Sequence, residues 1–332
     1  MPIAFLTGAT GFVGGHVARA LVAEGWTVRI LARDPARARG GLLEGLPVEV
    51  SAGSLSSGAG GLESAVAGAD AVVHVAGLVK ARTLEEYREV NVRGTERLLS
   101  AAGKTAPGAL FLLVSSQAAA GPSCEGRAVS DGDEARPISW YGRSKREAEE
   151  AVARLWKGDW FVLRPGVIYG PYDRGLFVYF RMAAAGWIPV PAGATRVQLI
   201  GAERAALAVA RAASRRDLAG RIAFLSDPEP VTVGDLAARI ASLPRRKARL
   251  IRIPDGLVRA LGAAESAVER LTGRSRPFNA DKAKEILAGD WICDGAATGR
   301  LLGLPDPVPL DEGLKAVWDW YRRAGWLPGA AL

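Results

Sequence analysis

Cysteine and histidine are scarce in this chain of 332 residues. Cys124 and Cys293 are its two cysteines, and His16 and His74 its two histidines. Two distant cysteines cannot build a disulfide framework. These two cysteines and two histidines also cannot supply a four-ligand zinc site. We therefore expect no metal. The low cysteine content is typical of a protein of the reducing cytoplasm.

Long apolar runs are also lacking. No stretch approaches the roughly 20 apolar residues that span a bilayer. The first apolar run is short and leads directly into a glycine-rich turn, which is not typical of a secretory signal. The sequence predicts a cytoplasmic protein without an integral membrane segment.

Positive charge is in excess, with 43 Lys+Arg against 35 Asp+Glu and a net charge of +8. Such an excess suggests a nucleic-acid partner. The basic residues are spread along the chain, however, and Arg245-Arg246-Lys247 is a short cluster typical of a solvated loop. We expect no nucleic-acid partner.

Short apolar runs alternate with longer helical patterns, such as Phe12–Glu24, Leu84–Ala102 and Tyr141–Leu155. The runs are continuous, as in parallel strands that are buried on both faces. The predicted strands are Ile3–Thr7, Thr27–Leu31, Val48–Ser51, Ala71–Val75, Leu110–Ser115, Trp160–Arg164 and Ile222–Leu225. This order predicts an α/β fold with a Rossmann-type, doubly wound parallel sheet of about seven strands.

A glycine-rich turn follows the first predicted strand. Gly8, Gly11 and Gly14 have the spacing G-x-x-G-x-x-G. Glycine lets the backbone approach a pyrophosphate, and the next helix offers free N–H groups and its positive dipole end. A turn without a ligand is the alternative, but its place after the first strand favours a dinucleotide. The expected contacts are Gly8, Thr10, Gly11, Phe12, Val13 and Gly14.

The end of the second strand bears on the choice between NAD and NADP. A carboxylate here would hydrogen-bond the ribose 2′-hydroxyl of NAD. Position 32 is Ala, and Arg33 follows, with Arg37 four residues further on. A guanidinium can bind a 2′-phosphate with two hydrogen bonds. We predict a preference for NADP; the alternative is that Asp34 binds the ribose of NAD.

Tyr141 and Lys145 form a Tyr-x-x-x-Lys pattern at the start of a predicted helix. The spacing places both side chains on one helix face. A nearby ammonium lowers the pKa of a tyrosine, so the phenol can exchange a proton near neutral pH. The strand before this helix ends in Ser115-Ser116, and a hydroxyl there can hydrogen-bond a substrate oxygen. The Tyr-x-x-x-Lys pattern alone is a weak sign of an active site. It becomes informative because the glycine-rich turn, the serine and this helix occur in that order along the chain.

These motifs together resemble the extended short-chain dehydrogenases/reductases, the NAD(P)-dependent epimerase/dehydratase superfamily. Further matching segments are Ala69–Ala76, Asn91–Thr95, Val114–Ser116, Leu163–Pro171 and Asp311–Trp326. The resemblance extends over nearly the whole chain. It implies an enzyme that binds NAD(P).

The resemblance also implies residue roles. Tyr141 corresponds to the general acid/base, Lys145 to the residue that lowers its pKa and holds the nicotinamide ribose, and Ser116, rather than Ser115, to the catalytic hydroxyl. Further cofactor contacts are expected at Ser54, Leu55, Ala76, Gly77, Pro165 and Val167. Substrate contacts are expected at Ser116, Gln117, Tyr141 and Arg174. Asn91 and His74 are expected to be structural.

The branch and the reaction follow from more detailed similarities. Ser116 is followed by Gln117-Ala118-Ala119, so the acid that dehydratases of the superfamily place there is missing. The segment Val28–Pro35 and the C-terminal half are similar to the dihydroflavonol-reductase and 3β-hydroxysteroid-dehydrogenase branch. This similarity implies hydride transfer between NADP and a ketone or secondary alcohol of a fairly apolar small molecule.

Two other functions stay open. An NAD-dependent nucleotide-sugar epimerase would hold its nucleotide through residues 193–203, which keep Arg196 but have Glu203 where Asp is usual. A non-enzymatic NADP-binding sensor is disfavoured by the intact set of Ser116, Tyr141 and Lys145. The resemblance also implies a homodimer that forms through the Tyr-x-x-x-Lys helix and its neighbour.

The expected division of the chain has two parts. Residues 1–170 are expected to form the NAD(P)-binding Rossmann domain, and residues 200–226 are expected to return to it. Residues 171–332 are expected to form a smaller, mainly helical substrate-binding region. Within this region, 254–273 can be written as an amphipathic helix, with Leu257, Val258, Leu261, Val268 and Leu271 on or near one stripe. The helix could pack on its own domain, cover an apolar substrate pocket or contact lipid.

Overall fold

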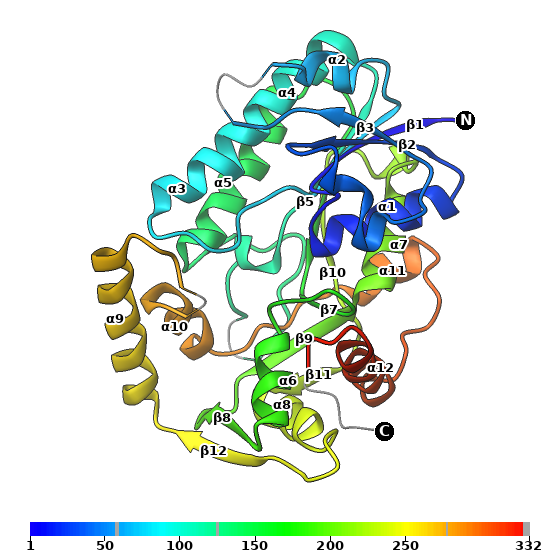
Figure 1. Cartoon of the computed structure of the whole chain (residues 1–332). Helices are drawn as coiled ribbons and strands as arrows, with labels where there is room; N and C mark the ends of the chain where they lie inside the picture. Colours follow the sequence, from blue (N-terminus) through cyan, green and yellow to red (C-terminus); the bar gives the residue numbers. More distant parts are fainter. Residues whose placement is uncertain (57–59, 124–125, 277, 328–332) are drawn as a thin grey trace.

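The computed structural model describes residues 1–56, 60–123, 126–276 and 278–327. Cys124 lies outside the described residues. In Figure 1 the chain forms an upper part around a large sheet and a lower part that consists mainly of residues after position 170.

The large sheet is parallel and has the strand order β10-β6-β5-β4-β1-β2-β3. Its strands are β1 (Ile3–Thr7), β2 (Thr27–Ala32), β3 (Val48–Ala52), β4 (Ala71–His74), β5 (Leu110–Val114), β6 (Trp160–Pro165) and β10 (Arg221–Leu225). The seven-stranded, doubly wound sheet predicted from the apolar runs is confirmed. The strand order reverses between β1 and β4, and ligands of such sheets bind at the carboxyl ends there.

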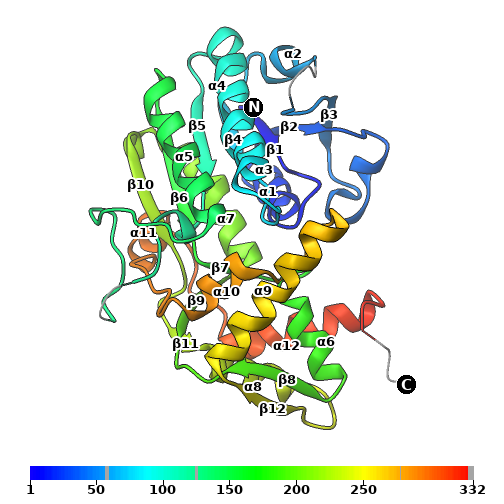
Figure 2. The same cartoon turned by 90° about the vertical axis from the view of Figure 1, so that its left-hand side faces the viewer.

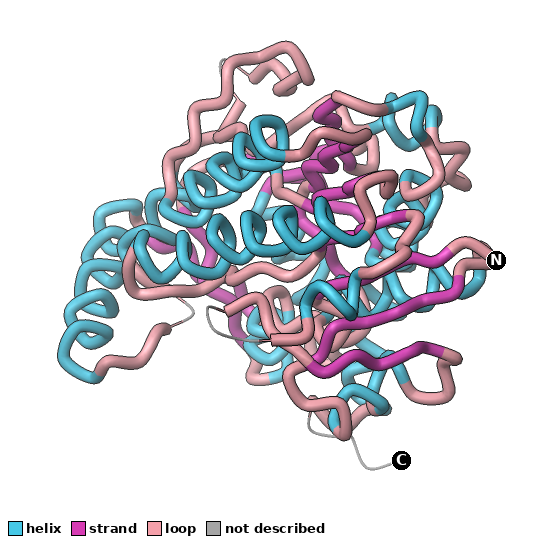
Figure 3. Tube along the Cα trace, turned by 90° about the horizontal axis from the view of Figure 1, so that it is seen from above, coloured by secondary structure: helices cyan, strands magenta, loops and turns pink. Residues whose placement is uncertain are grey.

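Helices cover both faces of the sheet, as the continuous apolar strands require. One face packs against α1 (Phe12–Ala23) and α7 (Ala202–Ala212). The other packs against α2 (Leu62–Val66), α4 (Gly94–Thr105) and α5 (Trp140–Leu155). Seen from above, the strands are fanned by their twist (Figure 3). Strand β10 thus returns to this sheet from the second half of the chain.

The segment predicted as helical over Leu84–Ala102 is helical throughout but not a regular α-helix. It consists of α3 (Leu84–Arg88), a π-helical turn over Glu89–Arg93, and α4. The turn directs Asn91 into the interior, where its side chain bonds to the backbone of Leu78. A π turn inserts one extra residue into a helix and often marks a functional site.

The lower part is mainly helical. Its helices are α6 (Phe177–Ala184), α8 (Val233–Ala241), α9 (Asp255–Thr272), α10 (Ala280–Leu287) and α12 (Leu310–Arg323), and α11 (Ala296–Leu301) lies beside β10. Short 3₁₀ turns lie at Arg37–Arg39, Gly41–Leu43, Gln117–Ala119 and Arg216–Leu218. Phe180, Trp318 and Tyr321 form the centre of a third apolar core here.

Two small sheets complete the lower part. The first has the order β11-β9-β7, from Pro230–Thr232, Arg196–Gly201 and Val167–Tyr169. The second pairs β12 (Arg249–Ile253) with β8 (Trp187–Pro191). These strands are not among the seven predicted from the sequence, because they are short or contain proline, arginine or glycine. Among the described helices, none is both long and apolar enough to cross a bilayer.

Candidate active site

The glycine-rich turn forms a close-packed cradle between β1 and α1. Gly8 has a φ of +79°, and a Cβ there would lie 2.7 Å from the amide nitrogen of Ala76. A Cβ at Gly14 would collide with the carbonyl of Gly8. Gly11 caps α1 without a side-chain hydrogen bond, so the first N–H groups of the helix remain for an anion. This arrangement fits a dinucleotide pyrophosphate, with Thr10, Phe12 and Val13 at the same turn.

The outer edge of the cradle carries the residues expected near the adenosine ribose. Arg33 is exposed directly after β2 and has no ion pair with any residue that the structure describes. The side chain of Arg37 lies outside the described part. Ser54 accepts a hydrogen bond from the Ser56 amide (3.1 Å), and the Leu55 carbonyl accepts one from Arg97 (2.7 Å). The loop after β3 is therefore fastened to α4.

The loop after β4 contains Ala76 and Gly77. Thr7 Oγ1 lies 2.7 Å from His74 Nδ1, and it accepts a hydrogen bond from the Ala76 amide at 3.3 Å. Burial, assisted by the charge of Lys145, lowers the pKa of His74 to about 3. A neutral, buried imidazole between two threonine hydroxyls is the structural role expected for this histidine.

Asn91 connects this loop to the helix that carries the tyrosine. Its Oδ1 accepts from the Leu78 amide (2.7 Å), and its Nδ2 donates to the Leu78 carbonyl (3.0 Å) and to Ser144 Oγ (2.9 Å). Ser144 lies between Tyr141 and Lys145 in the sequence. The structural role expected of Asn91 is therefore to fix α5 relative to the loop after β4.

Tyr141 and Lys145 lie in the first turns of α5. The helix is capped by Ser139, which accepts a hydrogen bond from the Gly142 amide (3.0 Å). Lys145 is buried, and its Nζ donates to the carbonyl of Val114 at 2.8 Å. A Cβ at Gly77 would lie 3.7 Å from the same Nζ. The ammonium thus lies beside the loop that is expected to carry the cofactor.

Burial is the largest influence on the pKa values of Lys145 and Tyr141. It lowers the pKa of Lys145 to about 8, although the Glu149 carboxylate acts in the opposite direction. Burial raises the pKa of Tyr141 to about 12; a hydrogen bond with Ser116 lowers it, and the charge of Glu285 raises it. The Nζ of Lys145, to which the resemblance assigns the lowering of this pKa, is bonded to the carbonyl of Val114. Burial thus favours the neutral form of the Tyr141 phenol.

The two adjacent serines have different environments. Ser116 is half-buried, bonds with Tyr141 and caps the 3₁₀ turn Gln117–Ala119, accepting from the Ala118 amide at 3.2 Å. Ser115 is buried and donates to Glu149 at 2.5 Å. The hydroxyl beside the phenol is thus that of Ser116.

A buried ion pair anchors α5 to the sheet. Arg164 of β6 donates to both carboxylate oxygens of Glu149 of α5, at 2.9 and 2.6 Å, and both side chains are buried. The sequence analysis did not find this pair. The available signals were an arginine inside an apolar strand and a glutamate four residues after Lys145.

Of the residues expected to contact substrate, Ser116 and Tyr141 are hydrogen-bonded to each other, whereas Gln117 and Arg174 have other neighbours. Gln117 is buried beside Gly166, and its Nε2 has no partner within the described part of the chain. Pro165 is buried at the end of β6, and Val167 is exposed on β7. The guanidinium of Arg174 lies over the ring of Trp326 at 5.2 Å. The contacts described for Arg174 do not bring it to Tyr141.

Helix α10 contributes residues that the sequence analysis missed. Asp281 Oδ2 accepts a hydrogen bond from the Trp140 amide at 2.9 Å. Glu285, one turn later, acts electrostatically on Tyr141 and has one buried carboxylate oxygen without a described partner. No local motif marks these residues, because the fold brings them from far along the chain. They form a polar wall beside the phenol.

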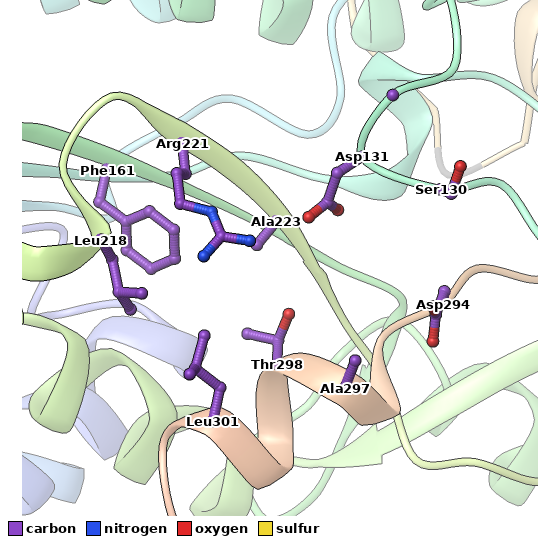
Figure 4. A pocket seen from close by; sticks show the side chains of 11 residues that line it. Ser130, Asp131, Phe161, Leu218, Arg221, Ala223, Asp294, Ala297, Thr298 and Leu301 are labelled. Atoms are coloured by element: carbon purple, nitrogen blue, oxygen red, sulfur yellow. The ribbon is translucent and has the colours of Figure 1, made fainter.

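A separate cavity of about 480 Å³ lies between β10 and α11 (Figure 4). Asp131, Arg221, Asp294 and Thr298 are among its lining residues, and none of the predicted site residues is. Among the described residues, no three or more His, Cys, Asp or Glu side chains are grouped as a metal site.

Comparisons with known proteins place this geometry in a family. A model of the NAD dependent epimerase/dehydratase family matches residues 4–211. A ceramide reductase of Caulobacter vibrioides (strain NA1000 / CB15N) is 38% identical over 97% of this chain and 95% of that protein. A 3 beta-hydroxysteroid dehydrogenase/Delta 5-->4-isomerase of Mycobacterium tuberculosis (strain CDC 1551 / Oshkosh) is 28% identical over 95% of this chain and 89% of that protein.

Solved structures agree on the fold. The structure of the UDP-glucuronic acid 4-epimerase from Bacillus cereus is similar to this one, with a TM-score of 0.76 at 17% sequence identity. The aligned region covers 98% of this chain and 100% of the epimerase chain. The branch predicted from sequence is confirmed by the reductase and 3-beta-hydroxysteroid dehydrogenase relatives. The chain belongs to the NAD dependent epimerase/dehydratase family and is an NAD(P)-dependent oxidoreductase of the extended short-chain dehydrogenase/reductase type.

Proposed function

We propose that this protein is an NADPH-dependent reductase that acts on a ketone of a lipid. The observation that carries the proposal is the pair of Tyr141 and Ser116 hydroxyls, which are hydrogen-bonded to each other beside the buried Lys145. A phenol in this position can donate its proton to a carbonyl oxygen, and the relative named as a ceramide reductase favours the direction of reduction.

The chain's own residues account for the proton side of the reaction. The Ser116 and Tyr141 hydroxyls would both donate hydrogen bonds to the carbonyl oxygen, which orients the ketone and stabilises negative charge on it. Bound NADPH would supply the hydride to the carbonyl carbon. Tyr141 then gives its proton to the oxygen, and the cation of Lys145 stabilises the resulting negative charge nearby.

The lipid part of the proposal rests on the relatives and on one arginine. The two relatives named above carry the names of lipid enzymes, and the ceramide reductase matches over nearly the whole chain. The guanidinium of Arg196, the basic group that an epimerase would use on its nucleotide, donates to Asp290 Oδ2 through Nε at 2.9 Å and through Nη2 at 2.5 Å. This engagement disfavours the epimerase alternative.

Turnover with matched substrates tests the function. The full chain is incubated with NADPH and an oxidised ceramide that carries a ketone, with a steroid ketone, or with UDP-glucose. We expect NADPH oxidation and a product two mass units heavier for the ceramide-derived ketone. Tyr141→Phe should lose at least about 100-fold in kcat while keeping its Kd for NADPH. Epimerisation of UDP-glucose without net NADPH oxidation would refute the proposal.

We further propose a homodimer that forms through α5 and its neighbour α4. These helices lie side by side on one face of the sheet (Figure 1), and Leu155 at the end of α5 is exposed. Light scattering during size-exclusion chromatography measures the mass. A monomeric mass of about 35 kDa at micromolar concentration would contradict the dimer.

A further inference from the structure

The positive charge of this chain is concentrated in one segment. Residues 245–276 contain nine Lys or Arg against three Asp or Glu, a net charge of +6 out of the chain's total of +8. Most of the 43 Lys and Arg lie elsewhere in the chain, where acidic residues nearly balance them, so it is the net charge that is concentrated here. The segment forms the loop before β12, β12 itself, α9 and the residues that follow it.

The cations at the start of this segment are exposed and unpaired. Arg245, Arg246, Lys247, Arg249, Arg252 and Arg259 are all exposed, and none forms an ion pair with a residue that the structure describes. Many other arginines are paired, such as Arg216 with Asp159 at 2.8 Å. Six free cations close together in the sequence create a positive potential that attracts an anionic partner.

Large apolar side chains are exposed among these cations. In the β8–β12 sheet, Ile188 and Val190 point into the core below α6 and α8. The register pairs Arg249 with Trp187, on the opposite face. Trp187 is 45% exposed and Ile251, two residues after Arg249, is 49% exposed. This outer face thus combines an indole, a branched apolar side chain and a cation.

Helix α9 extends the same surface. Val258 and Gly262 are buried, and Gly262 allows close approach of α10, since a Cβ there would lie 2.8 Å from the Cβ of Ala283. Leu257 and Leu261, one helical turn apart, are 49% and 45% exposed. Of the stripe expected from the sequence, Val258 is buried, whereas Leu257, Leu261 and Leu271 are exposed. The helix thus packs on its own domain through one side, and its exposed leucines are available for a lid or a lipid contact.

The place of these residues in the fold decides between the two. In both Figure 1 and Figure 2, the loop before β12, β12 and the first turns of α9 lie at the end of the molecule away from the seven-stranded sheet. A residue there cannot cover Tyr141. We call Trp187, residues 245–252 and residues 257–261 the basal surface.

We propose that the basal surface docks on the surface of an anionic lipid bilayer. Exposed tryptophan, isoleucine and leucine side chains enter the boundary between headgroups and acyl chains, and the surrounding cations contact anionic headgroups. Arginine and lysine suit this position, because their aliphatic stems can lie along apolar groups while the charge stays in water. The inference stands on this surface and does not depend on which substrate is reduced.

The other end of α9 lies near the catalytic residues. Gly273, which ends α9, lies beside Arg82 in the loop before α3, and α10 reaches Trp140 and Tyr141. Docking through the basal surface would therefore keep the catalytic residues at a fixed height above the bilayer, about one helix length away. The enzyme could then bind a lipid substrate while it stays docked on the membrane surface.

Vesicle co-sedimentation of the full chain tests the docking. We compare vesicles of phosphatidylcholine alone with vesicles that contain 30% phosphatidylglycerol. We expect binding to the anionic vesicles, at least about tenfold weaker binding to the neutral ones, and loss of binding at high salt. Arg245→Gln/Arg246→Gln and Leu257→Ser/Leu261→Ser should each weaken binding at least about fivefold.

Matched variants elsewhere serve as controls. Arg322→Gln/Arg323→Gln removes two exposed cations of α12, and Val308→Ser removes a side chain that is 60% exposed. Both should bind as the unmodified chain does. Circular dichroism checks that every variant is folded, and turnover on a detergent-dispersed substrate separates a failure of docking from a failure of the proposed function.

Three outcomes would overturn the docking. The first is equal binding of the basal variants and the controls to anionic vesicles, or no binding at all. The second is a dimer that dissociates when Leu257 and Leu261 are replaced, which would assign the surface to a second copy of this chain. The third is binding of a DNA duplex that is as tight as vesicle binding and is lost in the arginine variant.

Discussion

The carboxylate of Glu285 in α10 lies within electrostatic range of the phenol of Tyr141 in α5. Burial sets the high pKa of the phenol, the hydrogen bond with Ser116 partly offsets it, and the charge of Glu285 adds to it. The amide of Trp140, next to the tyrosine, is bound by Asp281 of the same helix. Helix α10 is therefore in a position to tune the proton donor without contacting the cofactor cradle.

Replacing this carboxylate should change the pH dependence of turnover. Glu285→Gln removes a negative charge beside the phenol, so the pKa of Tyr141 falls. Reduction requires the protonated phenol, and its rate should therefore decline at a pH about 0.5 units lower than in the unmodified enzyme. The measurement is kcat against pH. Glu312→Gln, on the exposed face of α12, is the control, and an equal shift in it would exclude a local effect.

We expect Ser116 to have a chemical role and Ser115 a structural one. Ser116→Ala removes the hydroxyl beside Tyr141, and we expect kcat to fall by about 100-fold with little change in unfolding temperature. Ser115→Ala removes the hydrogen bond to Glu149, which should lower the free energy of unfolding by about 1 kcal/mol and leave most activity. Steady-state kinetics and thermal unfolding measure both. The reverse pattern would move the catalytic hydroxyl to Ser115.

The buried Arg164–Glu149 pair should be costly to break from one side. Glu149→Gln leaves the guanidinium without its counter-charge in the interior, and about 3 kcal/mol of stability should be lost. Asp159→Asn, in the exposed pair with Arg216, should cost less than about 1 kcal/mol. Urea unfolding compares the two. If Glu149→Gln does not fold, Glu149→Gln/Arg164→Met should recover a folded protein, since both buried charges are then removed together.

Lys145 should destabilise the protein at neutral pH. Burial holds its pKa at about 8, below the usual value near 10.5. Below pH 8 the folded state carries a buried charge that the unfolded chain keeps in water, and this cost disappears as the pH rises from 8 to 10.5. The unmodified protein should therefore gain about 3 kcal/mol over this range relative to Lys145→Met. Unfolding measured across these pH values checks the sign; a constant difference would contradict the depressed pKa.

Arg33 should decide the cofactor preference. Its exposed guanidinium lies directly after β2, where a 2′-phosphate would be bound. Arg33→Ala should weaken NADPH binding at least tenfold and leave NADH binding nearly unchanged. Calorimetric titration of both cofactors provides the values. Unchanged discrimination would argue against the clamp, and Arg39→Ala is a control on a neighbouring exposed arginine.

The sequence was sufficient for the sheet but not for everything around the phenol. Continuous apolar runs such as Leu110–Val114 carry their own evidence of burial on both faces, and Tyr141 and Lys145 share a helix, so local spacing predicted their proximity. Asp281 and Glu285 reach the phenol through tertiary packing, which has no sequence period. The π turn at Glu89–Arg93 was missed because no residue type in this segment marks a π turn.

The concentration of charge in residues 245–276 makes the molecule an electric dipole. The other 300 residues together carry a net charge of only +2, so the high isoelectric point near 9.8 describes one end of the protein rather than its whole surface. In an external field such a molecule experiences a torque before it touches anything. Approach to a negatively charged body would therefore begin with rotation, and the first collision would already present the same end.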